Sequence, residues 1–476
     1  MSPVISTAVI PAAGRGLRAW PKTSKRPKAL LEIDGKSLIE RNIELLRGQM
    51  GVSRIVVIVG HLQEQIRQKL GSSVEYVECL TPDDGLARGL LLGRGPVGRS
   101  NFAVVLSDEL YLGSNHSRLR EEELEGCDAI CGILRTPDLH RIKRNYGVTV
   151  ENGRITSAVE KPQTLINDLL GCGTYLFTPA IFDSIEATPV SARSGRVELT
   201  DAIDRLARQG RVKSFFLTGD YFNINTVDDY NYASYHVREE SFASKRISVV
   251  IPAYDEESSI ASVVADFRGA VHEVLVVNNS SSDRTAEAAA AAGARVVTVQ
   301  LEGYGDTIRH GLDVARGDIL VVVEGDFSFR ARDLRKMLEY LKDADMIVGT
   351  RTTRELVEQG ANMRGPVRWG NVIVAKMVEL LWWNLQPRFT DVGCTYRALW
   401  KETYWAIRPL LRGTGPALSP EMMVAALKAR KRVIEVPVSY HRRIGGESKH
   451  SSNYFRISRT ALRMLWTIFR QRLSAG

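Results

Sequence analysis

The sequence predicts an α/β protein with two doubly wound domains of Rossmann-like architecture. Residues 6–14 (STAVIPAAG) and 246–256 (RISVVIPAYDE) open in the same way, each with a β-branched run that leads into Pro and turn-forming residues. Each is followed by a helical pattern and by a second apolar run, at 53–60 and at 272–279. This βαβ rhythm is typical of a parallel sheet flanked by helices, and it begins twice.

The length of the chain agrees with two domains. It has 476 residues, too many for one typical domain and enough for two of roughly 200–250 residues. A polar, charged stretch, VREESFASKR, lies between the two βαβ patterns at 237–246. We therefore expect a first domain over 1–238, a linker over 239–246 and a second domain over 247–476.

Composition narrows the partners and the compartment. The net charge of +9 favours anionic partners, either phosphates and nucleotides or an anionic membrane face. No zinc-finger spacing, aromatic RNA-binding motif or helix-turn-helix pattern accompanies this charge, so nucleic acid is not expected. The five cysteines form no C-x-x-C pair, which predicts free thiols in the cytoplasm. We find no signal-peptide pattern and no apolar stretch of the ~20 residues that cross a bilayer.

The most specific motif covers residues 11–39, PAAGRGLRAWPKTSKRPKALLEIDGKSLI. Its glycines follow a strand, where backbone N–H groups can approach phosphate oxygens, and Arg18 and Lys28 bring cations to the same place. Nucleotidyl transfer needs this arrangement, because positioned cations and a metal must neutralise the transition state and the leaving pyrophosphate. The alternative, a solvated basic loop, is disfavoured by the complete pattern directly after a strand.

At these residues the chain closely resembles the sugar-1-phosphate nucleotidyltransferases, and the resemblance continues to about Tyr230. It implies that Arg18 grips the triphosphate and that Lys28 contacts the phosphates at the reacting centre. Asp108, at the end of an apolar run, corresponds to a magnesium-binding aspartate. Asn223 stands where many relatives have a second one, and an amide oxygen can also ligate Mg²⁺. The resemblance thus implies Mg²⁺ or Mn²⁺ as cofactor.

The same resemblance supplies the substrate pocket. A nucleoside triphosphate and a sugar 1-phosphate are the implied substrates. The nucleotide-binding residues would be Ala13, Gly14, Gly16 and Gly85. The sugar-phosphate residues would be Glu160, Lys161, Gly173 and Glu198. Cytidylyltransferases for phosphocholine or inositol phosphate share the opening motif and remain an alternative, although the Glu-Lys-Pro at 160–162 favours a sugar.

The second half carries acidic groups after successive apolar runs. The third of these runs ends in Glu324-Gly325-Asp326, and an acidic pair at a strand end can hold a divalent metal on a diphosphate. From Ile247 to about Ser452 the chain resembles family 2 glycosyltransferases of the GT-A fold, and among them the polyprenyl-phosphate branch that includes dolichol-phosphate mannose synthases.

This second resemblance implies a nucleoside diphosphate-sugar donor and a second Mg²⁺ or Mn²⁺ site. Asp326 would be the catalytic and principal metal ligand, with Glu324 as its companion. The nucleotide would be bound by Pro252, Tyr254, Glu256 and Asp283. The sequence departs from the family pattern at Glu324, where aspartate is usual, and at Asn278, where an acidic residue is usual.

Basic residues would hold the acceptor. The resemblance implies that the phosphate of a lipid acceptor, a polyprenyl phosphate, lies against Arg351, Arg442, Arg443 and Lys449; a solvated basic surface is the alternative. A phosphate acceptor is already ionised and needs no general base. A hydroxyl acceptor would need one, and Asp391 or Glu421 would then be the candidate.

Two stretches, 368–387 and 454–473, mix tryptophans and other apolar residues with charged ones. They predict amphipathic helices at a membrane surface, with packing against the domain core or a second subunit as the alternative. We therefore expect a bifunctional enzyme, cytoplasmic and peripheral at the inner face of the cell membrane. A catalytically silent binding module as one of the two domains is a further alternative, and the sequence leaves a homo-oligomer open.

Overall fold

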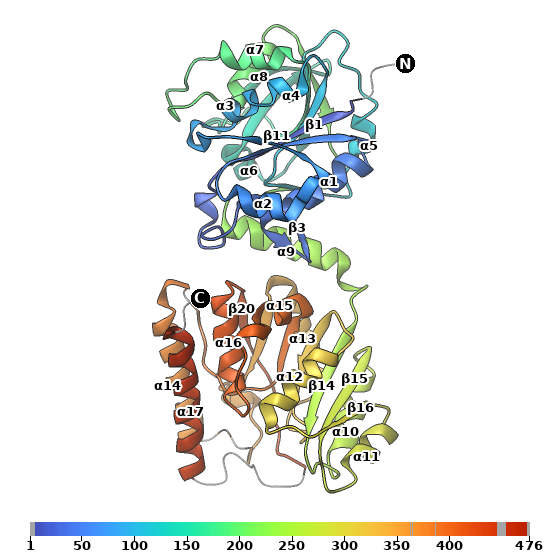
Figure 1. Ribbon diagram of the computed structural model, residues 1–476, viewed down its shortest axis with the longest axis vertical. Helices are drawn as coiled ribbons and strands as arrows, with labels where there is room; N and C mark the ends of the chain where they lie inside the picture. Colours follow the sequence, from blue (N-terminus) through green and yellow to red (C-terminus); the bar gives the residue numbers. More distant parts are fainter. Residues whose placement is uncertain (1–4, 362, 364, 386, 445–453, 474–476) are drawn as a thin grey trace. The chain divides into compact units, whose positions relative to one another are not determined.

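The computed structural model describes residues 5–361, 363, 365–385, 387–444 and 454–473 (Figure 1). It divides into two compact units, Met1–Val237 and Arg238–Gly476. Helix α9 (Val227–Phe242) crosses this division in the sequence. The segment 239–246 that the sequence assigned to a linker is therefore helical as far as Phe242. All five cysteines are buried, and none forms a disulfide.

The first unit is built on a nine-stranded sheet in the order β5-β4-β1-β6-β11-β8-β12-β10-β9. The strands are β1 (Thr7–Ala12), β4 (Arg54–Val59), β5 (Glu75–Glu78), β6 (Phe102–Val105), β8 (Ala129–Arg135), β9 (Tyr146–Glu151), β10 (Arg154–Glu160), β11 (Leu169–Phe177) and β12 (Val212–Phe216). Strands β5, β4, β1 and β6 run parallel, whereas β11 is antiparallel to both β6 and β8. The predicted α/β class is confirmed, with a mixed rather than a wholly parallel sheet.

Both faces of this sheet are buried. Successive residues of β1 alternate between two core clusters, with Ala8 and Ile10 in one and Val9 in the other, as the two-residue period of a strand requires. The helices of this unit are α1 (Leu38–Gly48), α2 (Gln63–Leu70), α3 (Leu86–Leu91), α4 (Arg94–Val97), α5 (His116–Leu119), α6 (Leu139–Arg144), α7 (Ala180–Glu186), α8 (Leu199–Ala207) and α9. Helix α1 begins at a capping box formed by Ser37 and Glu40.

A separate two-stranded sheet carries part of the candidate site. It pairs β7 (Glu109–Leu112) with β13 (Asp220–Asn223) in antiparallel register, so that Asn223 lies opposite Glu109. Because β7 begins directly after Asp108, this register brings Asp108 and Asn223, which are more than a hundred positions apart in the sequence, to the same end of the two-stranded sheet. A short hairpin of β2 (Glu32–Ile33) and β3 (Lys36–Ser37) precedes α1.

The second unit is built on a seven-stranded sheet in the order β16-β15-β14-β17-β19-β18-β20. The strands are β14 (Ile247–Ala253), β15 (Glu273–Asn279), β16 (Arg295–Val299), β17 (Ile319–Val322), β18 (Met346–Thr350), β19 (Arg397–Trp400) and β20 (Val433–Pro437). Strands β16, β15, β14 and β17 are parallel, and β19 runs antiparallel between β17 and β18. The carboxyl ends of β15, β14 and β17 therefore meet at one edge, where ligands bind in such sheets.

Helices cover this second sheet as well. They are α10 (Ile260–Arg268), α11 (Thr285–Ala291), α12 (Tyr304–Val314), α13 (Leu334–Asp343), α14 (Pro366–Leu381), α15 (Lys401–Ile407), α16 (Leu418–Lys428) and α17 (Tyr454–Leu473). Helix α16 is almost wholly buried, and α17 packs against both α16 and α14 (Figure 1). Among the residues that the structure describes, no helix combines the length and the apolar character needed to cross a membrane.

Candidate active sites

A cavity of about 670 Å³ opens in the first unit beside the loops that follow β1 and β6. Every residue that the sequence singled out in this half lines it: Ala13, Gly14, Gly16, Arg18, Lys28, Gly85, Asp108, Glu160, Lys161, Gly173, Glu198 and Asn223. These residues come from loops and strand ends spread over more than two hundred positions. The fold thus brings the two implied groups, nucleotide-binding and sugar-phosphate-binding, into one chamber.

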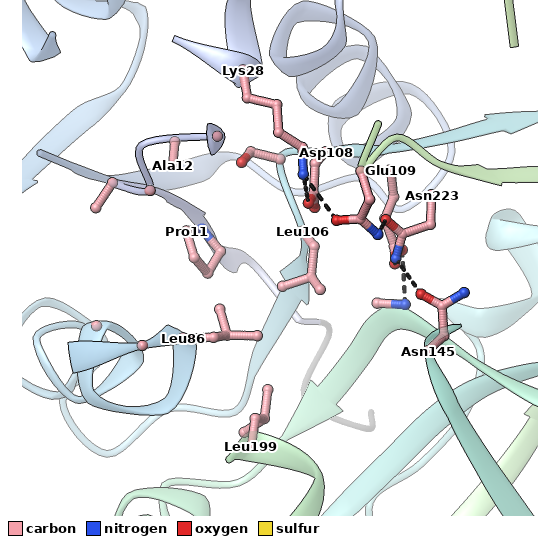
Figure 2. Close-up of a pocket in the computed structure, with 18 of the residues that line it drawn as sticks. Pro11, Ala12, Lys28, Leu86, Leu106, Asp108, Glu109, Asn145, Leu199 and Asn223 are labelled. Atoms are coloured by element: carbon pink, nitrogen blue, oxygen red, sulfur yellow. Dashed lines mark hydrogen bonds and ion pairs between the residues drawn. The ribbon is translucent and has the colours of Figure 1, made fainter. Parts of the chain in front are cut away.

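Lys28 and Asp108 form the centre of the polar wall. The Nζ of Lys28 lies 2.6 Å from Oδ2 of Asp108, and the two side chains are only 13% and 25% exposed. Figure 2 shows them pointing toward one another, with Glu109 and Asn223 on the same side of the cavity. Partial burial weakens solvent screening, so this ion pair is stronger than one at an open surface.

A chain of side-chain amides continues from this ion pair. The Oδ1 of Asn225 accepts hydrogen bonds from Nη2 of Arg18 at 2.7 Å and from Nζ of Lys28 at 3.2 Å. The Nδ2 of Asn225 donates to Oδ1 of Asn223 at 2.5 Å, and Nδ2 of Asn223 donates to Oδ1 of Asn145 at 2.8 Å. Sequence reasoning missed Asn225, although it lies only two positions after the expected metal ligand.

Glu109 is the second residue that the sequence did not reveal. Its carboxylate is buried and accepts hydrogen bonds from the hydroxyls of Tyr111 (2.5 Å) and Tyr221 (2.6 Å) and from the backbone N–H of Gly173 (2.7 Å). Burial and the neighbouring charge of Asp108 raise the pKa of Glu109 to about 7. The only signal in the sequence was its position directly after the expected metal ligand.

Two glycines of the cavity are required by its geometry. A Cβ on Gly173 would lie 2.6 Å from the carboxylate of Glu109 and 2.5 Å from Leu106, so no larger residue fits. Gly85 has a φ of 97°, a conformation that side chains rarely adopt. Gly173 therefore shapes the floor of the cavity beneath Glu109, and Gly85 allows the turn into α3.

The far end of the cavity holds the expected sugar-phosphate residues. An oxygen of Glu160 accepts a hydrogen bond from the hydroxyl of Thr200 at 2.9 Å, and Nζ of Lys161 lies 3.6 Å from Glu160. Burial raises the pKa of Glu160. Glu198 lies 3.5 Å from a guanidinium nitrogen of Arg193. This end thus offers carboxylate acceptors and one ammonium donor, which suits a hydroxylated ligand that carries a phosphate.

The donor set fits a divalent metal. A carboxylate (Asp108) and an amide oxygen (Asn223) line the same cavity, and both are the hard oxygen ligands that Mg²⁺ prefers. Among the described residues, no cluster of three or more His, Cys, Asp or Glu could hold a metal. Mg²⁺ needs no such cluster, because it is commonly bound by one or two protein oxygens together with substrate phosphates and water.

In the second unit the expected metal residues meet an arginine. The Nε of Arg443 lies 2.8 Å from Oδ2 of Asp326, and its Nη2 lies 3.3 Å from Oε2 of Glu324. Glu324 also accepts from the hydroxyl of Thr395 at 2.9 Å, and Asp326 from the backbone N–H of Ser328 at 2.9 Å. Burial and the charge of Asp326 raise the pKa of Glu324. Two carboxylate oxygens again fit a divalent metal.

The expected nucleotide residues of this unit lie at the end of β14 and on the loops that follow β14 and β15. Pro252 lies on β14 opposite Val277 of β15, and Tyr254, which follows β14, is half-exposed. The backbone N–H of Glu256 donates to the Thr285 hydroxyl at 2.8 Å. Asp283 accepts from the backbone N–H of Glu257 at 3.1 Å, which ties the two loops together.

The expected acceptor residues differ in burial and in their partners. Arg351 is buried and bonded twice to Asp391, at 2.8 and 3.0 Å, so its charge is already paired within the fold. The charges of Arg351 and Arg443 both act on Glu324 and Tyr440, so Arg351 stays an expected member of the acceptor site. Arg442 is exposed, Arg443 contacts the acidic pair, and Lys449 lies outside the described residues.

Neither candidate for a general base is available. Asp391 is fully buried, and although burial alone would raise its pKa, the ion pair with Arg351 holds that pKa below its usual value. Glu421 is also fully buried and accepts from the backbone N–H groups of Arg412 (2.9 Å) and Gly413 (2.6 Å). Arg470 lies 3.2 Å from the same carboxylate. Both carboxylates are bonded within the fold, and neither faces an open part of the site.

Comparison with known proteins finds relatives of each unit. A family model described as nucleotidyl transferase matches residues 7–240, and one described as glycosyl transferase family 2 matches residues 248–397. The UTP–glucose-1-phosphate uridylyltransferase AglF of Haloferax volcanii is 32% identical over 245 residues, which cover 49% of this chain and 97% of that protein. An uncharacterized glycosyltransferase of Mycobacterium tuberculosis is 33% identical over 216 residues, which cover 44% of this chain and 92% of that protein. A crystal structure of UDP-glucose pyrophosphorylase complexed with UDP-glucose covers 50% of this chain and 99% of its own, with 24% identity and a TM-score of 0.43.

Proposed function

Residues 7–240 belong to the nucleotidyl transferase family and residues 248–397 to glycosyl transferase family 2, and on that premise we propose a bifunctional enzyme of two consecutive steps. The first unit joins a nucleoside triphosphate to a sugar 1-phosphate and releases pyrophosphate. The second transfers the sugar to an acceptor, for which we propose a polyprenyl phosphate. UTP and glucose 1-phosphate are the first pair to test, because the name of the Haloferax volcanii relative contains them.

The Lys28–Asp108 pair beside Arg18 carries the proposal for the first unit. Lys28 and Arg18 would hold the triphosphate, and Asp108 with Asn223 would hold a divalent metal. A bound metal supplies charge neutralisation at the phosphates. The two cations orient the triphosphate and offset the charge that develops on the leaving pyrophosphate. Glu160 and Lys161 would fix the sugar 1-phosphate at the far end of the cavity.

Pyrophosphate release by the purified chain tests this step. We expect release with Mg²⁺ and one pair from a grid of nucleoside triphosphates and sugar 1-phosphates. Lys28→Met should reduce it by about 100-fold or more, because it removes a charge at the reacting centre. Lys36→Met is the matched control, since Lys36 makes an exposed ion pair with Glu44 and does not line the cavity. Release with phosphocholine or inositol phosphate alone would instead identify a cytidylyltransferase of the alternative type.

The proposal for the second unit rests on Glu324, Asp326 and Arg443 at the carboxyl edge of the sheet. A donor diphosphate there would meet a metal on the two carboxylates. Arg442, Arg443 and Lys449 would neutralise the acceptor phosphate, which needs no base. We expect purified chain to transfer sugar from the donor made by the first unit to a short polyprenyl phosphate, and Asp326→Asn to abolish the transfer. Unchanged transfer by that variant would contradict the assignment, and transfer only to a hydroxyl acceptor would contradict the acceptor.

We further propose that α14 and α17 dock on a membrane surface. Each packs on the unit through one face, so core packing accounts for part of these helices. Large apolar side chains remain exposed on or beside them: Trp369 (65%), Ile373 (60%), Leu380 (71%), Trp383 (70%), Leu462 (66%), Trp466 (69%) and Leu473 (84%). Exposed Arg463 and Arg472 accompany them, and each cation near anionic lipid contributes about 1 kcal/mol.

Vesicle sedimentation tests the docking. The chain should sediment with vesicles that contain phosphatidylglycerol and less with purely zwitterionic vesicles. Trp383→Ser combined with Trp466→Ser should lower the bound fraction several-fold, because both indoles are exposed. Trp405→Ser, which removes a half-exposed tryptophan on α15, is the control. A chain that stays in the supernatant with both kinds of vesicle would rule the docking out.

A further inference from the structure

Asn225 connects the two cations of the polar wall, Arg18 and Lys28, to the amide of Asn223. Its side-chain oxygen accepts hydrogen bonds from Arg18 at 2.7 Å and from Lys28 at 3.2 Å. Its NH₂ donates a hydrogen bond to the side-chain oxygen of Asn223 at 2.5 Å. Lys28 in turn lies 2.6 Å from Asp108. The two cations expected to bind the triphosphate and the two oxygens expected to bind the metal are therefore joined through one neutral side chain.

The orientation of this amide is fixed at both ends of the chain of hydrogen bonds. Arginine and lysine can only donate, so the oxygen of Asn225 must face them. Its NH₂ then faces Asn223, whose carbonyl oxygen must accept. The NH₂ of Asn223 is left to face the acceptor oxygens of Asn145 (2.8 Å) and Glu109 (3.4 Å). Asn225, Asn145 and Glu109 thus favour the same orientation of Asn223, in which its oxygen, the only atom of that amide able to ligate a metal, is not turned toward Glu109.

Lys28 is shared between a charged acceptor and a neutral one. A divalent metal that binds Asp108 competes directly with the ammonium of Lys28 and repels it. The oxygen of Asn225 carries no net charge and does not belong to the proposed metal-ligand pair. Lys28 can therefore leave Asp108 and stay within the site on Asn225, beside Arg18, where a triphosphate needs it.

The backbone at Asn225 is held independently of its side chain. Its N–H donates to Oδ2 of Asp229 at 3.1 Å. The next residue, Thr226, forms a reciprocal cap with Asp229 at the start of α9, through bonds of 2.8 and 3.2 Å. An alanine at 225 keeps all of these bonds, so its effects report the loss of the amide rather than the loss of the turn.

We propose that Asn225 is a positioning residue for nucleotidyl transfer. It holds Lys28 and Arg18 together when a metal binds Asp108, and it helps Asn145 and Glu109 to keep the oxygen of Asn223 available to that metal. The inference rests on the proposed function of the first unit. It requires that removing Asn225 weakens metal binding and that removing Lys28 strengthens it. Loss of Asn225 removes the alternative acceptor for Lys28, whereas loss of Lys28 removes the competitor for Asp108.

Binding of Mn²⁺ without substrates tests this sign. The measurement uses the full chain with Asp326→Asn, which removes the principal metal ligand expected in the second unit, and follows free Mn²⁺ by electron paramagnetic resonance. Asn225→Ala should weaken Mn²⁺ binding about tenfold, in line with the loss of a charge-assisted hydrogen bond. Lys28→Met should strengthen it about tenfold. In the Lys28→Met background, Asn225→Ala should weaken Mn²⁺ binding clearly less, because there is no longer a Lys28 ammonium for Asn225 to hold away from Asp108.

Turnover supplies the second readout. Asn225→Ala should lower kcat for pyrophosphate release about 10- to 100-fold, because the cations lose their alignment. It should leave KM for the sugar 1-phosphate within about twofold, because Asn225 makes no contact at that end of the cavity. Asn115→Ala is the matched control, since Asn115 also makes two hydrogen bonds, to Phe216 and Thr218, but does not line the cavity.

The outcomes separate the inference from the proposed function. No pyrophosphate release by the wild-type chain would remove the function, whatever the metal data. Release with unchanged Mn²⁺ affinity and kcat in Asn225→Ala would leave the function and overturn the inference. Tighter Mn²⁺ binding in both Asn225→Ala and Lys28→Met, or equal effects of Asn225→Ala with and without Lys28, would overturn it as well.

Discussion

Replacing Arg351 by methionine should destabilise the second unit severely. Arg351 bonds to both oxygens of Asp391, at 2.8 and 3.0 Å, and the Asp391 side chain has no exposed surface. Asp391 accepts two backbone N–H groups as well, from Arg351 and Gly393. Methionine keeps the aliphatic volume and leaves the carboxylate buried without a counter-charge. Loss of one partner from such a pair costs about 3–5 kcal/mol, and we expect that decrease in the free energy of unfolding.

Urea unfolding followed by tryptophan fluorescence measures this effect in the full chain. Of the 7 tryptophans only Trp20 lies in the first unit, so the signal reports mainly on the second. Arg354→Met, at an exposed position three residues on, should stay within about 0.5 kcal/mol of wild type. Adding Asp391→Asn to Arg351→Met should recover part of the loss, because no charge then stays buried. Wild-type stability of Arg351→Met together with a raised KM for the acceptor would refute this reasoning and assign Arg351 to acceptor binding instead.

Three further results are expected. Burial lowers the pKa of His116 from 6.5 to about 4, so as pH falls below about 6.5 the unfolded chain takes up the proton before the folded chain does, and the free energy of unfolding decreases. Between pH 7 and 4.5 the first unit should lose about 2–3 kcal/mol of stability, and the His116→Gln variant should not show this loss. Unfolding at both pH values measures the difference. Gly173→Ala should lower the free energy of unfolding by about 1–3 kcal/mol and abolish most pyrophosphate release, because the new Cβ would lie 2.6 Å from Glu109. Gly48→Ala is the control and should change neither, because a Cβ at Gly48 would have no neighbour within 4 Å. Arg443→Gln should tighten Mn²⁺ binding without nucleotide about tenfold, because Arg443 pairs with both expected metal ligands; an unchanged titration would contradict that competition.

The fold and the membership of the first cavity could be predicted because both depend on local sequence. Buried strands are recognisable as β-branched runs, and the loops after their carboxyl ends meet at one edge of the sheet whatever the details. Gly14 and Gly16, Lys28 and Asp108 are each attached to such a strand end or loop. Their convergence on one cavity follows from strand order alone.

The side-chain partners of individual residues could not be predicted, because residues far apart in the sequence meet only through tertiary packing. Arg351 is a cation on a loop, and nothing in its neighbourhood of sequence indicates that Asp391, forty residues later, neutralises it. The same holds for Glu421, whose sequence context of PEMM suits either a base or a structural carboxylate. The side chain of Glu421 is 0% exposed, and this burial identifies it as a structural carboxylate rather than a base.

The asparagine at 223 shows how a departure from a family pattern can be explained by a contact. Read alone, Asn223 lacks the charge of a second metal-binding aspartate. In the fold it lies opposite Glu109, and its Nδ2 is 3.4 Å from that buried carboxylate. An aspartate would place a third negative charge beside Glu109 and Asp108, in a setting where burial already raises the pKa of Glu109 to about 7. An amide instead donates to Glu109 and offers its oxygen to the cavity, so the neutral residue at 223 and the buried acid at 109 belong to one arrangement.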